Sequence, residues 1–296
     1  MTAYNSKFNS HGTRATIICF LIAISGCMNQ SRGFRSATDA LSKTTHTATI
    51  GTVFSAQNKS QTNGTPTIVF IEGDGASWTR GGKLPPKNPT PSQSILIDFF
   101  SPENGPPVNQ IYLGRPCQFV DPARFGDCDI SDWTSHRYAK KQTERIFAAL
   151  LYWLNKLEQS SSIHLIGHSG GGLMAVRLAF KLDQSGFQVN SITAISSPID
   201  PEYWTENRGF SPLQIDSYNE ELNWAVQHQC IDLWIGEDDR LISVKDIRPS
   251  IRKKMANQIK VVPNASHSKG WQQEWTKEIL PTILSSSLTC GKKRDE

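Results

Sequence analysis

The sequence lacks any apolar run of the roughly 18 to 20 residues that a helix needs to cross a bilayer. It also lacks a dominant charge, because 31 Lys and Arg stand against 27 Asp and Glu in 296 residues, a net charge of +4. An excess this small and scattered does not favour a nucleic-acid partner. With 38% hydrophobic residues the chain is too apolar for intrinsic disorder. Its length fits one α/β domain, or two small ones, with a substantial core.

Glycine motifs for phosphate binding are missing as well. Neither G-x-x-x-x-G-K-[ST] nor G-x-G-x-x-G occurs. Cysteine and histidine do not cluster at the spacing of a metal site. We therefore expect neither a metal nor a cofactor.

The first 26 residues have the pattern of a secretory signal. Basic residues precede an apolar run of eleven residues, Ala15–Ser25, which is too short to span a membrane. The run leads into Ile24–Cys27 (ISGC), which resembles the lipobox of bacterial lipoproteins. That resemblance implies cleavage before Cys27 and a lipid on its sulfur; the alternative is a signal that is cut elsewhere. We expect a signal over 1–26, a polar tether over 27–46, and a single domain over 47–296, exported and anchored to a membrane facing the periplasm or the cell exterior.

Export changes how the other cysteines are interpreted. Cys117, Cys128, Cys230 and Cys290 form an even set, which in an oxidising compartment suggests disulfides. Cys117 and Cys128 are eleven residues apart in a stretch rich in Pro, Gly and Asp, so we predict that they pair. Such a bond would stabilise the fold by about 2–3 kcal/mol. For Cys230 the sequence leaves open a buried thiol or a bond to Cys290.

Short apolar runs alternate with helical stretches through the rest of the chain. The expected strands are Thr47–Ala56, Thr67–Glu72, Ser94–Phe99, Ile163–Gly167, Ser191–Ser196, Ile231–Gly236 and Gln258–Val262. The expected helices are Tyr138–Leu157, Gly171–Asp183, Val244–Lys254 and Gly270–Leu284. Runs rich in Ile and Val that alternate with helices are typical of buried parallel strands. The pattern predicts the α/β class, a doubly wound and mostly parallel sheet with helices on both faces.

The sharpest motif is Gly167–Gly171 (GHSGG), directly after an apolar strand and at the start of an apolar helix. In that context G-x-S-x-G is a nucleophile elbow, in which Ser169 sits on a strained turn and the flanking glycines avoid clashes. A serine nucleophile needs a base and an orienting carboxylate later in the chain. Of seven histidines, only His267 follows both the serine and the candidate acids, between the last strand and the last helix.

At this point the chain resembles the α/β-hydrolase superfamily, from about Thr67 to Leu284. The resemblance implies that the triad acid lies three residues after Gly236, which makes it Asp239. Asp238 is the nearest rival, Glu237 a weaker one, and Asp200 corresponds to a position that some lipases use.

The oxyanion hole follows from the same resemblance. One N–H would come from Gly170, and the other from Asp74 in the loop after an early strand. Glu72 stands where many superfamily members have His. Acids beside a developing oxyanion are unfavourable unless they point away or are paired, and Arg115 or Arg137 could be the partner.

A narrower group of exported bacterial α/β-hydrolases is similar at Arg115–Gln118 (RPCQ), in the glycines after Ser169, and around Trp204 and Ser211–Leu213. The superfamily resemblance implies a serine hydrolase that cleaves a small-molecule or lipid ester, with no obligatory protein partner. The alternatives are a peptidase or amidase, a thioesterase or acyltransferase with the same triad, or a binding lipoprotein without activity.

Overall fold

The computed structural model describes residues 41, 45–60, 64–78, 84–100, 108–120, 126–157, 162–286 and 290–291. The predicted signal over 1–26, the lipidation residue Cys27 and most of the predicted tether lie outside the described residues. Among the described helices, none is both long enough and apolar enough to cross a membrane.

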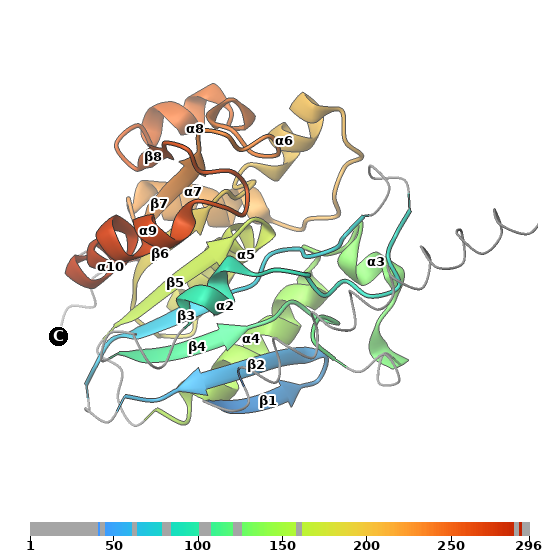
Figure 1. Cartoon of the computed structure of the whole chain (residues 1–296), viewed down its shortest axis with the longest axis vertical. Helices are drawn as coiled ribbons and strands as arrows, with labels where there is room; N and C mark the ends of the chain where they lie inside the picture. The colour runs from blue at the N-terminus through green and yellow to red at the C-terminus, as the bar shows by residue number, and fades with distance from the viewer. Residues whose placement is uncertain are drawn as a thin grey trace, which may run out of the picture.

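The described strands form one sheet in the order β1-β2-β4-β3-β5-β6-β7-β8 (Figure 1). The pairs β1–β2 and β2–β4 are antiparallel, and all neighbouring pairs from β4 to β8 are parallel. The strands are β1 (His46–Ile50), β2 (Val53–Asn58), β3 (Thr67–Ile71), β4 (Asn109–Leu113), β5 (Ile163–His168), β6 (Val189–Ile195), β7 (Ile231–Gly236) and β8 (Ile259–Val262). The predicted mostly parallel sheet is confirmed.

The segment Thr47–Ala56, expected to be one strand, is a hairpin. β1 and β2 pair antiparallel around a turn at Gly51, whose φ of +58° lies in the left-handed region. Glycine adopts that region without steric cost, so the chain reverses there. The single-strand prediction was wrong because the turn glycine stands inside an otherwise strand-like run.

The segment Ser94–Phe99 is a helix and not a strand. It forms α2 (Ile95–Phe99), and the Ser94 hydroxyl accepts a hydrogen bond from the Ile97 N–H at 3.1 Å, as an N-cap does. The strand that completes the sheet is β4 (Asn109–Leu113), which was not predicted. Periodicity cannot separate a short buried strand from one helical turn. Here the hydrogen bond to the Ser94 hydroxyl favours the helix.

Helices cover both faces of the sheet (Figure 1). They are α2, α3 (Ile130–Trp133), α4 (Lys140–Leu154), α5 (Gly170–Gln184), α6 (Pro201–Arg208), α7 (Tyr218–Gln227), α8 (Pro249–Lys254), α9 (Trp271–Glu274) and α10 (Leu280–Ser285), with a 3₁₀ turn η2 (Val244–Asp246) and a π-helical turn η3 (Trp275–Ile279). The predictions for α4 and α5 are confirmed to within three residues at each end. α6 and α7 were not expected.

The core lies in two layers, one on each face. Val69 and Ile71 of β3 belong to a cluster with α4, α5 and α7, whereas Ile68 and Phe70 belong to a cluster with α2, α9 and α10. Alternate side chains of one strand thus point to opposite layers. Full burial of each such side chain contributes about 1.5–3 kcal/mol. The two layers hold the strands rigidly, so that their carboxyl ends can carry a site.

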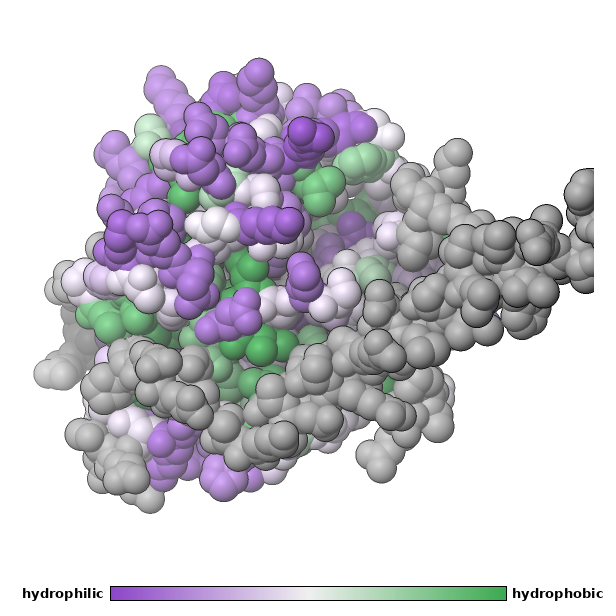
Figure 2. All heavy atoms as spheres, in the orientation of Figure 1, coloured by the Kyte–Doolittle hydropathy of each residue, from purple (hydrophilic) through white to green (hydrophobic). Residues whose placement is uncertain are grey.

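The outer surface around α8 is hydrophilic, as Figure 2 shows near the top of the view. The last turn of α8 carries Arg252, Lys253 and Lys254. Cations at a helix C-terminus interact favourably with the helix dipole, so these residues stabilise α8 while facing water.

Candidate active site

Ser169 lies on a tight turn between β5 and α5. Its φ of 53° and ψ of −129° are strained for a residue with a side chain. A Cβ on Gly167 would lie 2.2 Å from the Gly171 carbonyl carbon, and one on Gly171 would lie 2.1 Å from the Ile71 carbonyl oxygen. Only glycine fits at either position. The Ser169 N–H donates to the Ile195 carbonyl at 2.8 Å, which anchors the turn to β6.

His267 and Asp239 come together at the carboxyl edge of the sheet. His267 Nδ1 lies 2.9 Å from Asp239 Oδ2, and Asp239 Oδ1 accepts hydrogen bonds from the N–H groups of Leu241 and Ile242. Burial alone would raise the pKa of Asp239, but the hydrogen bond and charge of His267, with the Ile242 N–H, lower it below its ordinary value. The carboxylate stays ionised and can only accept, so Nδ1 of His267 donates to it.

The other acids considered from the sequence lie elsewhere. Glu237 and Asp238 are exposed. Asp200 is buried, and its carboxylate accepts from Nε of Arg248 at 2.7 Å and from Nη2 of the same residue at 2.6 Å. Of these four carboxylates, the structure brings only that of Asp239 to His267.

The loop Glu72–Gly75 lies directly against the serine turn. A Cβ on Gly73 would lie 3.3 Å from Ser169 Cβ, and one on Gly170 would lie 2.0 Å from Asp74 Oδ1. Within the described residues, neither the Asp74 N–H nor the Gly170 N–H makes a hydrogen bond. The structure therefore brings together, beside Ser169, the two N–H groups expected to form an oxyanion hole.

The side chain of Asp74 is paired with both candidate arginines. It accepts from Nη1 of Arg115 at 2.8 Å and from Nε of Arg137 at 2.7 Å, and the Tyr138 hydroxyl donates to it as well. Burial would raise the pKa of Asp74, but the charges of Arg137 and Arg115 bring it below the usual value. The same contacts raise the pKa of Arg137, against the effect of its burial. One carboxylate and two guanidinium groups give this cluster a net charge of +1.

Glu72, the departure from the superfamily pattern, is buried in its own hydrogen-bond network. Its Oε1 accepts from the Gly73 N–H at 2.9 Å, and its Oε2 accepts from the hydroxyls of Tyr112 and Ser94. Burial raises the pKa of this carboxyl above 4.5 despite these hydrogen bonds. The Glu72 side chain thus stabilises the Glu72–Gly75 loop.

His168, the variable residue of the G-x-S-x-G motif, contacts the backbone of His267. Its Nε2 lies 2.7 Å from the His267 carbonyl oxygen, and the two rings are 4.9 Å apart. Burial, together with the charge of His267, lowers the pKa of His168 to about 4, so the ring is neutral at pH 7. A carbonyl only accepts, so Nε2 of His168 donates. Its position directly before Ser169 was the only signal available in the sequence.

A cavity of about 250 Å³ opens at Ser169, lined by residues of the Glu72–Ala76 and Pro91–Gln93 segments together with His168, Ser169, His267 and Ser268. A wider, shallower hollow of about 950 Å³ shares Gln93, His267 and Ser268 with it and extends over Asp239 and Leu241. No group of His, Cys, Asp and Glu among the described residues could hold a metal ion. The cavity offers a serine, a histidine and backbone donors.

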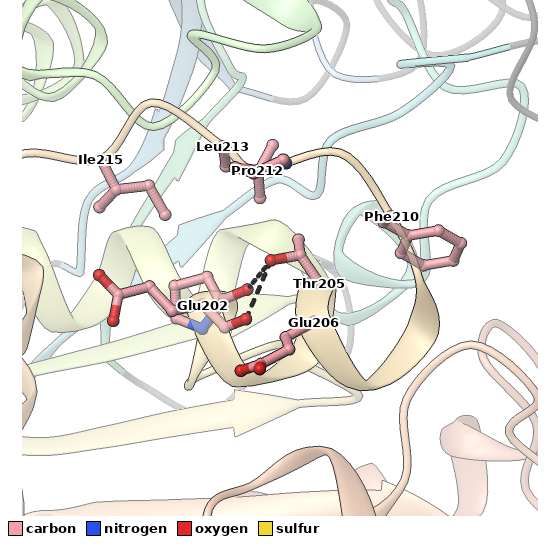
Figure 3. Close-up of a pocket in the computed structure, with 8 residues that line it drawn as sticks. Glu202, Thr205, Glu206, Phe210, Pro212, Leu213 and Ile215 are labelled. Atoms are coloured by element: carbon pink, nitrogen blue, oxygen red, sulfur yellow. Dashed lines mark hydrogen bonds between the residues drawn. The ribbon is translucent and has the colours of Figure 1, made fainter.

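A separate cavity of about 310 Å³ lies between α6 and the chain that follows it (Figure 3). It is lined by Pro201, Glu202, Thr205, Glu206, Phe210, Pro212, Leu213 and Ile215. The Thr205 hydroxyl donates back to carbonyls of its own helix. This cavity shares no lining residue with the one at Ser169, so the two are separate sites.

Two disulfides join the four described cysteines. Cys117 bonds to Cys128, as predicted, and Cys230 bonds to Cys290, which settles the question left open by the sequence. The first joins Cys117, two residues after Arg115, to Cys128. The second joins Cys230, directly before β7, to Cys290. Two disulfides indicate an exported protein.

No family model matches the sequence, and no curated protein sequence matches it. Among solved structures, the fold is similar to that of an esterase from Pyrobaculum calidifontis, with a TM-score of 0.51 and 12% identity over 86% of this chain and 91% of the esterase. It is also similar to a protein of unknown function from Agrobacterium tumefaciens, described as an α/β-hydrolase candidate, with a TM-score of 0.51 and 12% identity over 84% of this chain and 100% of the other. These likenesses confirm the α/β-hydrolase fold, and at this identity they show the fold alone.

Proposed function

We propose that this protein is an exported serine hydrolase that cleaves a carboxylic ester through an acyl-enzyme. The observation that carries the proposal is the 2.9 Å contact between His267 Nδ1 and Asp239 Oδ2, at a cavity that His267 shares with Ser169. A histidine oriented by a buried carboxylate, at a cavity that a serine also lines, is the arrangement that activates a hydroxyl.

In the first step Ser169 Oγ attacks the substrate carbonyl carbon, and Nε2 of His267 takes the hydroxyl proton. Asp239 keeps the imidazole in the tautomer that can accept this proton, and its negative charge stabilises the imidazolium that forms. The tetrahedral oxyanion accepts hydrogen bonds from the N–H groups of Gly170 and Asp74.

Collapse of the intermediate expels the alcohol, which takes its proton from His267. Water then attacks the acyl-serine with His267 again as base, and the acid leaves as Ser169 regains its proton. The chemistry uses the side chains of Ser169, His267 and Asp239 and two backbone N–H groups, with no cofactor. An ester is the substrate class of choice because its leaving group departs more easily than an amine.

The direct test is labelling of the purified protein with a fluorophosphonate probe, beside Ser169→Ala as the control. We expect strong labelling of the wild type and none of the variant, followed by hydrolysis of short p-nitrophenyl esters. A folded wild type that takes no label would contradict the proposal and favour a binding protein on the same fold. Faster turnover of amide or thioester substrates than of matched esters would change the substrate class and leave the triad in place.

We also propose that Cys27 carries the lipid anchor, on the basis of the ISGC sequence that ends the apolar run. Metabolic labelling with a palmitate analogue in a bacterial host is the test. The wild type should be labelled and should partition with membranes, whereas Cys27→Ala should lose the label. Labelling that persists in Cys27→Ala would refute this assignment.

A further inference from the structure

An oxyanion hole works only if its peptide groups face the right way before the substrate arrives. The second donor of the proposed hole is the N–H of Asp74, which belongs to the same peptide unit as the Gly73 carbonyl. In a trans peptide these two groups point in opposite directions, and the described chain has no cis peptide bond. Whatever holds the Gly73 carbonyl therefore also sets the direction of the Asp74 N–H.

The group that holds this carbonyl is the side chain of Gln118. Its Nε2 donates to the Gly73 carbonyl oxygen at 3.0 Å, and its Oε1 accepts from the Arg115 N–H at 3.1 Å. The residue is only 1% exposed. Because one end of the amide must accept and the other must donate, these two partners allow one orientation of the side chain.

We propose that Gln118 is a positioning residue that holds the Gly73–Asp74 peptide with the Asp74 N–H free beside Ser169, so that the oxyanion hole is formed before substrate binds. This inference rests on the proposed hydrolase function. It assigns a role to the Arg115–Gln118 segment, which the triad by itself leaves unexplained.

The neighbours of Gly73 support this role from both sides. The Gly73 N–H donates to Glu72 Oε1 at 2.9 Å, so the peptide before Gly73 is held as firmly as the one after it. A Cβ on Gly75 would lie 2.7 Å from Gln118 Nε2, so the loop turns closely around the amide. Only a residue without a side chain allows that approach, since Gly75 also has a φ of +62°.

Gln118 itself is held in place by strained backbone. The residues on either side, Cys117 and Phe119, have φ values of 71° and 55°. Side chains rarely adopt such values, and they persist where surrounding contacts impose them, most often at functional sites. Here the contacts are the disulfide from Cys117 to Cys128, the hydrogen bond from the Cys117 N–H to the Thr52 carbonyl, and the one from the Phe119 N–H to Thr90 Oγ1.

Two substitutions separate the hydrogen bonds of Gln118. Gln118→Glu keeps an acceptor for the Arg115 N–H but places an acceptor against the Gly73 carbonyl. Gln118→Met has nearly the same length and removes both bonds, together with the longer one, at 3.4 Å, from Nε2 to the Pro89 carbonyl. The matched control is Gln142→Met, because Gln142 is equally buried and its amide donates to Asp132, away from the cavity. Each purified full-length protein is compared for kcat and KM on p-nitrophenyl butyrate and for its melting temperature.

We expect kcat to fall about 10²-fold in both Gln118 variants, as happens when a donor of an oxyanion hole is lost. KM should stay within about threefold, because the hole acts on the tetrahedral state and less on the bound ester. Gln142→Met should keep the wild-type kcat even if its melting temperature falls. A folded Gln118→Met with kcat within about twofold of the wild type would overturn the inference, as would an equal loss in Gln142→Met.

A second measurement does not depend on turnover. A trifluoromethyl ketone adds to an activated serine to form a hemiketal whose oxyanion occupies the hole, with the serine proton passing to the histidine. Its affinity should weaken in the Gln118 variants by the same factor as kcat, and an unchanged affinity would contradict the inference. A wild type that neither hydrolyses the ester nor takes the fluorophosphonate label would overturn the hydrolase proposal itself. An active, labelled wild type with an equally active Gln118→Met would overturn only the role of Gln118.

Discussion

The carboxylate of Asp74 accepts a hydrogen bond from Nε of Arg137 at 2.7 Å, with both side chains nearly buried. Arg115 binds the other oxygen of the same carboxylate, so two guanidinium groups form ion pairs with one carboxylate. The cluster therefore keeps a net positive charge directly behind the proposed oxyanion hole. Such a charge favours a developing oxyanion.

Arg137→Met should cancel that charge and leave Asp74 with one guanidinium group. We expect the free energy of unfolding to fall by about 3 kcal/mol, as when a buried ion pair loses a partner. We also expect kcat to fall about 10-fold, because the positive charge no longer offsets the oxyanion. Urea unfolding and ester kinetics measure both. Arg145→Met is the control, since it likewise leaves a buried carboxylate, Asp132, with one remaining cation, Lys141, but away from the cavity, so kcat should stay at the wild-type value. Unchanged kcat in Arg137→Met would show that the cluster has no electrostatic role.

Asp239→Asn should abolish most activity without unfolding the protein. An amide at this position can stabilise the wrong tautomer of His267, and in serine hydrolases such a change lowers kcat about 10⁴-fold. Asp238→Asn, one residue away and exposed, should stay within about twofold of the wild type. The test is the rate of ester hydrolysis by both variants in stopped assays at pH 7. Loss of activity in Asp238→Asn with retention in Asp239→Asn would reverse the assignment.

His168→Leu should lower kcat by about 10-fold by releasing the His267 carbonyl, since a small displacement of a catalytic group is costly. His168→Gln can still donate to that carbonyl and should recover most of the loss. Because the pKa of His168 is about 4, its donor is present throughout the neutral range. The wild type and His168→Gln should therefore have pH–rate profiles of the same shape between pH 6 and 8. Equal activity of the Leu and Gln variants would argue against this contact.

Glu72 should make the wild type less stable as the pH rises. Its pKa in the folded state lies above the usual 4.5, so the folded state binds the proton more tightly than the unfolded chain. The stability from this group is present below pH 4.5 and is lost as the pH rises through the folded-state pKa. In Glu72→Gln this dependence is absent, so the difference in unfolding free energy, wild type minus variant, should fall as the pH rises above 4.5. Urea midpoints from pH 4 to 8 test it, and a difference that does not change with pH would contradict it.

The two disulfides should differ in what they support. Replacing Cys117 and Cys128 by Ala should cost about 3 kcal/mol of stability and also lower kcat, because the bond holds the Arg115–Gln118 segment. Replacing Cys230 and Cys290 opens a longer loop and should cost about 4 kcal/mol with kcat unchanged. Thermal unfolding and ester kinetics on the two double variants check this. An equal loss of kcat in both double variants would contradict a specific role of the Cys117–Cys128 bond in positioning the Arg115–Gln118 segment.

Local patterns in the chain identified the elements that carry the proposed chemistry. GHSGG after an apolar strand located Ser169, and the order of strands and helices predicted the parallel sheet and placed His267 after its last strand. Local patterns failed at Ser94–Phe99, where one turn of helix and one short strand have the same composition. They also failed at β4, whose first residues, Asn109 and Gln110, are polar but buried between neighbouring strands.

Contacts between segments that are distant in the chain could not be predicted from the sequence. Gln118 meets Gly73 across 45 positions, and His168 meets the His267 carbonyl across 99. Neither side chain is unusual in its local pattern. Four carboxylates could serve as the acid on chain order alone, and only packing brings one of them to the histidine.

The sequence alone determined the strand–turn–helix that carries the proposed nucleophile and the order of the candidate groups, because glycine spacing and apolar periodicity act over a few residues and are visible in the chain. The tertiary structure alone decided which groups touch: Asp239 and not Asp200 at His267, two arginines on Asp74, and Gln118 on the peptide of the proposed oxyanion hole. Those choices depend on the sheet, which aligns the carboxyl ends of strands far apart in sequence, and on burial, which requires every polar group brought there to find a partner.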